Sequence, residues 1–143
     1  MAKSKLFARF LTDQDREEAG VWVDFGDGIR IKVRRLRSRK SLDVRKELEK
    51  PFADQIRRAP LDDDTAQDLL LKQMSQGIIA DWENVDLGDG VTVPYTVDNA
   101  YKLLKALPEL RDAILQVSAD ADSYRAKVAE DTEKNLSDSS AGV

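Results

Sequence analysis

The chain has 143 residues, 41% of them hydrophobic and 35% charged, with a formal net charge of −4. It contains no cysteine, no histidine and no run of about 18 apolar residues, which excludes disulfides, thiolate metal sites, the most common general base of enzymes and a membrane-spanning helix. We therefore expect a single domain over residues 1–134 in a cytoplasm, followed by a small, polar, disordered tail over residues 135–143, with no catalytic residue, metal or cofactor.

The charges are distributed unevenly along the chain. Residues 1–60 hold 16 Lys and Arg against 10 Asp and Glu, whereas residues 61–143 hold 7 against 17. Two interpretations remain open. The two halves attract each other, within the fold or across a homo-oligomer, or the basic half forms a face for an acidic partner.

The first twenty residues contain an apolar cluster, Leu6, Phe7, Phe10 and Leu11, followed by a polar connector. The cluster is compatible with an edge strand or with a mobile segment. Thr12 is suited to cap one helical turn in the connector.

A β-hairpin is predicted over Val21–Arg34. Apolar and polar residues alternate on both sides of Gly26-Asp27-Gly28, and this period of two is typical of paired strands joined by a glycine-tolerant turn. A similar turn, Gly88-Asp89-Gly90, lies within Val85–Val93, which we expect to join the same sheet.

Four helical regions follow the hairpin in the sequence. The first has apolar positions from Leu42 to Ile56 and is interrupted at Pro51, and the second starts at Asp62-Asp63-Asp64 and extends to Trp82. The third is capped by Thr96 and the fourth begins at Pro108. The predicted fold is α+β, a small antiparallel hairpin sheet packed against about four helices, with Trp22, Trp82 and Tyr95 in structural roles.

The residues that could suggest a metal or phosphate site have ordinary structural explanations. The two Gly-Asp-Gly turns lack the spacing of a calcium loop or a phosphate loop, and the acidic runs 62–64 and 120–122 suit a helix start and a solvated helix face. The basic segment 30–46 is the feature that suggests nucleic acid, but no aromatic residue interleaves with it.

Two stretches resemble the tail assembly chaperones of long-tailed phages and prophages. One runs from Glu17-Glu18-Ala19-Gly20-Val21-Trp22-Val23 into Gly26–Ile31. The other is Gly77-Ile78-Ile79-Ala80-Asp81-Trp82-Glu83-Asn84-Val85, followed by Asp89-Gly90, Pro94-Tyr95-Thr96 and Asn99-Ala100. The resemblance covers residues 10–128. The basic Arg34–Lys40 stretch and the paired turns depart from the family's pattern.

This resemblance implies a non-enzymatic protein that binds the tape measure protein, assists assembly of the tail tube and is absent from the mature virion. Client contact is expected at apolar helix positions, namely Leu103, Leu107, Ile114 and Val117. The alternatives are a nucleic-acid-binding regulator that uses residues 30–46 and a structural tail or head-completion protein.

Overall fold

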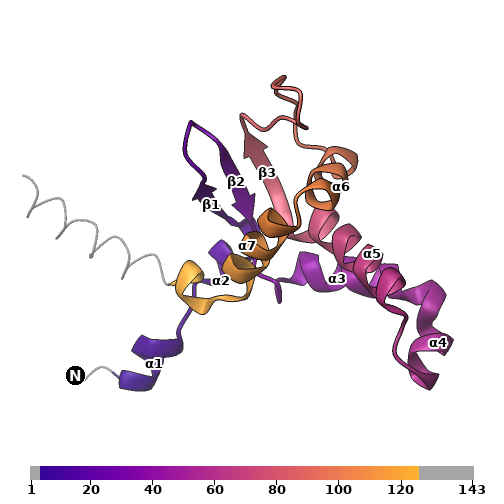
Figure 1. Ribbon diagram of the computed structural model, residues 1–143. Coiled ribbons are helices and arrows are strands. Elements are labelled where there is room, and N and C mark those ends of the chain that lie inside the picture. Colours follow the sequence, from indigo (N-terminus) through magenta and orange to yellow (C-terminus); the bar gives the residue numbers. More distant parts are fainter. Residues whose placement is uncertain (1–3, 126–143) are drawn as a thin grey trace, which may run out of the picture.

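The computed structural model describes residues 4–125 and contains a three-stranded antiparallel sheet surrounded by helices, which confirms the α+β class (Figure 1). The described chain has seven α-helices, so the expected number of about four is too low. Two additional helices come from the N-terminal segment, and Pro51 divides one predicted helix into two.

The described N-terminal segment is helical and does not form an edge strand. Helix α1 spans Lys5–Phe10 and α2 spans Gln14–Ala19. The cap of α2 is Asp13, whose carboxylate accepts from two backbone amides, while the Thr12 hydroxyl donates to Glu17 at 2.7 Å. The apolar side chains of α1 remain exposed.

The predicted hairpin is present. Strand β1 (Val21–Asp24) pairs with β2 (Arg30–Val33) in antiparallel register, with Val21 opposite Val33. Gly26, Asp27 and Gly28 all have positive φ, the conformation that such a turn requires. Ile31 and Val33 are buried against the helices.

The third strand is formed by residues predicted to be helical. Helix α5 (Asp63–Gln73) passes into one π-helical turn, η2 (Met74–Ile78), and then into β3 (Ile79–Glu83), which pairs with β2. The predicted helix to Trp82 is therefore wrong at its C-terminal end. Lys32 lies opposite Asp81, and Val33 lies opposite Ile79, so Ala80 is an extra residue that bulges from the strand.

The segment Val85–Val93 does not join the sheet, contrary to the prediction. It forms a loop beyond β3 with one isolated bridge between Asp86 and Thr92. The Asp86 carboxylate accepts from the amides of Gly88 at 3.0 Å and Gly90 at 3.1 Å, so it organises the loop internally. These hydrogen bonds hold the pKa of Asp86 below its ordinary value.

Four further helices have sequence-readable starts. Ser38 caps α3 (Arg39–Glu49), Pro51 lies in the short 3-10 turn η1 (Lys50–Phe52) before α4 (Ala53–Arg58), and Thr96 caps α6 (Val97–Ala106). Pro108 opens α7 (Pro108–Ala119), which is followed by the 3-10 turn η3 (Ala121–Tyr124). Apolar residues repeat every three or four positions from Leu110 to Val128, a pattern that predicts a longer amphipathic helix, but α7 ends at Ala119. The end of this repeat, like the predicted tail at 135–143, lies outside the described residues.

Trp82 and Tyr95 join the sheet to the helices. Trp82 is 5% exposed, its indole Nε1 donates to the Val93 carbonyl at 2.8 Å, and its ring meets Tyr95 edge-on at 5.5 Å. The Tyr95 hydroxyl in turn donates to the Ser75 carbonyl in η2 at 2.6 Å. Trp22 lies on the outer face of the sheet instead, with the Arg30 guanidinium 4.5 Å from its ring centroid.

Candidate partner-binding groove

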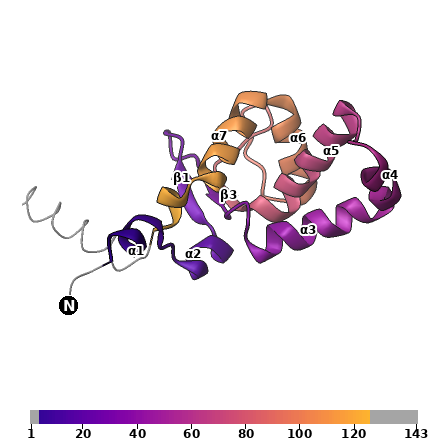
Figure 2. The same ribbon diagram turned by 90° about the horizontal axis from the view of Figure 1, so that it is seen from below.

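An apolar groove is lined by residues of α3, α4 and α5. Helix α4 lies at the end of the molecule opposite α1 (Figures 1 and 2). Helix α5 packs on α3, where the Gln73 amide donates to the Ser41 hydroxyl at 3.0 Å. Proline residues at 51 and 60 turn the chain at each end of α4. The apolar side chains between the three helices therefore stay partly open to solvent.

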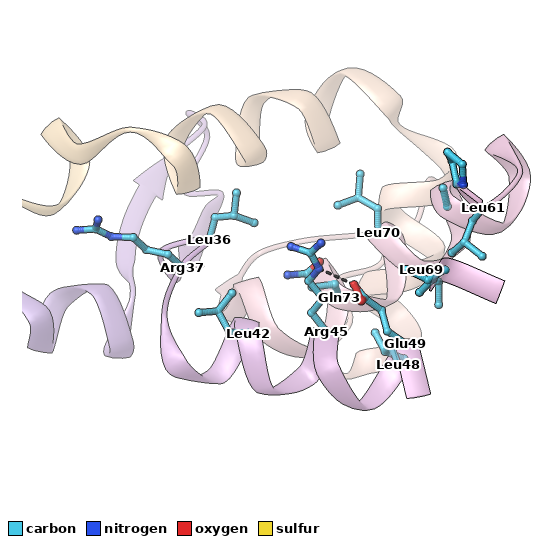
Figure 3. Close-up of a pocket in the computed structure, with 13 residues that line it drawn as sticks. Leu36, Arg37, Leu42, Arg45, Leu48, Glu49, Leu61, Leu69, Leu70 and Gln73 are labelled. Atoms are coloured by element: carbon cyan, nitrogen blue, oxygen red, sulfur yellow. Dashed lines mark hydrogen bonds and ion pairs between the residues drawn. The ribbon is translucent and has the colours of Figure 1, made fainter. Parts of the chain in front are cut away.

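The groove has a volume of about 700 Å³ and an apolar lining (Figure 3). Leu42 is 46% exposed and Ile56 is 38% exposed, while the leucines facing them from α3 and α5 are half-buried. Its apolar lining residues are Leu36, Leu42, Leu48, Ile56, Pro60, Leu61, Ala66, Leu69 and Leu70. A concave apolar surface of this kind suits the apolar face of a helix.

Charged groups stand at the rim of the groove. Arg45 donates to Glu49 at 2.6 Å in an exposed pair along α3, and Arg37 contacts Glu17 at 3.2 Å. The exposed acidic run 62–64 at the start of α5 follows Leu61 in the sequence and does not line the groove itself. An apolar floor with a charged rim is the arrangement that fixes both the affinity and the orientation of a bound helix.

The groups whose pKa is shifted lie outside the lining of the groove. Burial raises the pKa of Tyr95 and raises that of Tyr124 well above its ordinary range. The Tyr101 hydroxyl and the Lys72 ammonium bond to Asp68 and hold the pKa of that carboxyl below its ordinary value. Each shift has a structural partner within the fold, so none of these groups marks the groove as a site of acid–base chemistry.

The four predicted contact residues do not share one exposed face. Leu103 and Ile114 are buried in the core, Val117 packs against it, and Leu107 is exposed at the end of α6. Client contact at these positions remains a prediction. The groove was not identified from the sequence, although Leu42, Leu48 and Ile56 stood in a recognised helical stripe.

Several arginines of the basic segment 30–46 make hydrogen bonds or ion pairs with other residues of the chain. Arg30 forms a bidentate pair with Glu83 at 2.9 and 3.0 Å, and Arg34 donates to the Glu18 carbonyl at 2.9 Å. Arg35 is buried and contacts Glu17 at 3.3 Å. These contacts leave fewer guanidinium groups to meet phosphates, so the segment supports nucleic-acid binding less than its sequence indicated.

Residues 4–125 contain no group of three or more acidic side chains placed to hold a metal ion. In the same part of the chain, no helix is long and apolar enough to cross a membrane.

Comparison with known proteins gives one family. The model of a family described as YdaY prophage protein matches residues 37–135, more than half of the chain. The match includes every residue that lines the groove except Leu36, and it leaves out β1 and β2. No curated protein and no solved structure matches the chain.

Proposed function

This chain belongs to the YdaY prophage protein family, and we propose that it is a non-enzymatic tail assembly chaperone that binds a helical segment of the tape measure protein. The groove between α3, α4 and α5 is the observation that carries the proposal. It is a concave apolar surface within the part of the chain that the family shares. The protein acts in the host cytoplasm, contacts the tail tube protein during assembly and is left out of the mature virion.

The dimensions and chemistry of the groove favour a helical client. A helix with side chains is about 10 Å across and offers anchors at positions i, i+3, i+4 and i+7. Leu42 on α3, Ile56 on α4 and Leu69 on α5 all line the groove, so such anchors gain apolar contact with three helices. Repeated apolar helices along one client would bind several copies, and avidity would replace strong single contacts.

The decisive experiment is co-expression with the tape measure protein of the same prophage. We expect the wild-type chain to co-purify with the tape measure protein and to raise its soluble fraction, and Leu42→Asp/Ile56→Asp to lose both effects. Val91→Asp is the matched control, because Val91 is an exposed apolar residue on the loop beyond β3, outside the groove. Failure of the wild-type chain to co-purify, or equal capture by the groove variant, contradicts the proposal.

The same assay separates the groove from the helix face predicted earlier. Leu107 is exposed and does not line the groove, so Leu107→Asp tests the α6–α7 face without disturbing the core. Loss of capture in this variant alone would place the client on that face. Detection of the chain in purified virions would favour the structural-protein alternative.

A further inference from the structure

An ion pair on α3 interrupts the apolar lining of the groove. Arg45 and Glu49 lie one helical turn apart, and the Arg45 Nε donates to the Glu49 carboxylate at 2.6 Å. Two groups of apolar side chains flank this pair in Figure 3, namely Leu36 and Leu42 on its left and Leu61 and Leu69 on its right. A helix that contacts both apolar groups therefore has to pass over the ion pair.

The ion pair keeps polar atoms available at the surface of the groove. The hydrogen bond between Arg45 and Glu49 uses one guanidinium N–H and one carboxylate oxygen. The Arg45 side chain is 61% exposed and the Glu49 side chain is 34% exposed, so water can reach their other polar atoms. A bound helix removes this water. Charged groups that lose water without gaining a hydrogen-bond partner oppose binding, so the client residue that covers the pair decides how well the helix binds.

We propose that the groove selects a helix that carries a glutamine between two apolar anchors. The amide of glutamine both donates and accepts, so it can donate to the second oxygen of Glu49 and accept from the guanidinium of Arg45. A carboxylate in this place bonds only to Arg45 and is repelled by Glu49, and an ammonium bonds only to Glu49 and is repelled by Arg45. An aliphatic side chain bonds to neither.

The position of the pair also sets the spacing of the anchors. Leu42 and Glu49 are two turns apart on α3, which is about 10 Å along the helix axis. A client helix that runs along α3 therefore reaches both apolar groups with anchors two turns apart, at positions i and i+7. The residues at i+3 and i+4 lie on the same face between these anchors, so one of them is the glutamine.

This selectivity rests on the proposed function for the identity of the client, and it defines which segments of that client bind. A uniformly apolar helix places an aliphatic side chain over Arg45 and Glu49 and loses affinity for that reason. Specificity of this kind comes from a cost imposed on the wrong partner as much as from contacts with the right one.

Synthetic helices test the selectivity without the tape measure protein. Four labelled, alanine-rich peptides of about 20 residues carry leucine at i−4, i, i+7 and i+11 and differ at i+4, which is Gln, Glu, Lys or Leu. Fluorescence anisotropy measures their binding to the full chain. We expect the Gln peptide to bind at least about tenfold more tightly than the Leu peptide. Absence of binding by the Gln peptide, or equal or tighter binding of the Leu peptide, overturns the proposal.

A double variant shows whether the ion pair is the cause. Arg45→Leu/Glu49→Leu should lose the preference for the Gln peptide and bind the Leu peptide better than wild type does. The matched control is Asp98→Leu/Lys102→Leu, which removes an exposed ion pair of the same spacing from α6, outside the groove, and should keep the preference. Circular dichroism verifies that both variants are folded. A preference that survives in the Arg45/Glu49 variant overturns the proposal.

Single substitutions give a reciprocal readout. Arg45→Gln leaves the charge of Glu49 and should favour the Lys peptide over the Glu peptide, whereas Glu49→Gln leaves the charge of Arg45 and should favour the Glu peptide. Lys46→Gln changes the net charge as Arg45→Gln does, but Lys46 is exposed on α3 and does not line the groove, so the wild-type order should persist. An equal shift in the Lys46 variant would contradict direct contact with the pair.

The peptide assay and the co-expression assay fail separately. Capture of the tape measure protein without any preference among the peptides overturns the selectivity and leaves the proposed function standing. Selection of the Gln peptide without capture of the tape measure protein overturns the proposed function and supports the selectivity of the groove.

Discussion

The junction, which we define as η2, β3 and the residues packed on them, and the groove both contain large aliphatic side chains, but the junction buries them and the groove leaves them partly exposed. At the junction, Met74, Ile78 and Ile79 are fully buried. In the groove, Leu42 and Ile56 remain partly in water. The difference arises from geometry, because the junction is enclosed by the sheet, α3 and α6, whereas the side chains between α3, α4 and α5 line an open groove.

The comparison indicates how the chain divides its apolar residues between stability and binding. Burial of a large aliphatic side chain contributes roughly 1.5–3 kcal/mol to folding. A side chain that is half exposed contributes only part of this to folding, and the rest becomes available when a partner covers it. Substitutions at the junction should therefore change stability, and substitutions in the groove should change binding.

Trp82→Ala is expected to have the largest effect. It removes a buried aromatic ring, the edge-on contact with Tyr95 and the hydrogen bond to Val93, and should lower the free energy of unfolding by about 3–5 kcal/mol. Urea denaturation followed by circular dichroism measures this. A loss below about 1 kcal/mol, the size of a typical surface change, would show that the junction is not the stable region.

Gly77→Ala tests how closely the junction is packed. A Cβ at residue 77 would lie 2.9 Å from the Ser41 Cα, a backbone atom that cannot move independently of α3. We expect a loss of about 1–3 kcal/mol in the free energy of unfolding, although alanine is the better helix former. Gly88→Ala is unsuitable as a control, because Gly88 has a positive φ that alanine rarely adopts. Ala66→Gly, at an exposed position of α5, measures instead the effect of helix propensity alone.

Tyr124 should make the free energy of unfolding depend on pH. It lies beside the junction, and its hydroxyl donates to the Val33 carbonyl at 2.8 Å. Its pKa is raised in the folded protein, so the folded state retains the phenol proton while the unfolded chain loses it above about pH 10. The stabilisation is complete below that pH and is lost as the pH rises. Between pH 10 and 11, wild type should lose about 1 kcal/mol more than Tyr124→Phe.

Paired urea titrations of the two proteins at both pH values measure this difference. Comparing the pH dependence removes the constant cost of the lost hydrogen bond. Equal slopes for both proteins would mean that the phenol ionises as readily in the folded state as in the unfolded chain.

The smallest stability effect is expected in the groove. Leu42→Ser should lower the free energy of unfolding by only about 1 kcal/mol, because Leu42 is 46% exposed and only part of its side chain is buried. The same variant should lose client capture. A loss of several kcal/mol would erase the distinction between junction and groove.

The sequence was informative where local chemistry determines the structure. Thr96 was predicted to cap a helix, Pro108 to lie in a first turn and the acidic run 62–64 to start a helix, and each does so. The hairpin was predicted because its alternation and its turn are local signals. Each of these features involves residues close together in the chain.

The missed strand has a specific physical cause. Ile79 and Trp82 are three residues apart, which is a helical spacing, yet both are buried from the same strand. The bulge at Ala80 inserts one residue between them and so replaces the usual spacing of two with three. A strand with a bulge in this position therefore imitates a helix in its apolar pattern.

The groove escaped prediction for a different reason. Periodicity places Leu42, Leu48 and Ile56 on apolar helix faces, but it does not say which faces are covered by another element. That depends on the angles between α3, α4 and α5, which arise from contacts between distant residues such as Gln73 and Ser41.

The contacts that join the first and last described segments also constrain the order of folding. Thr12 bridges Arg125, the Asp13 amide donates to the Tyr124 carbonyl, and Tyr124 reaches back to Val33. Closing such a long loop is slow, since its entropy must be lost before the contacts form. During synthesis, residues 8–13 therefore gain their contacts with Tyr124 and Arg125 only after residue 125 has left the ribosome, so the N-terminal segment takes its final position last.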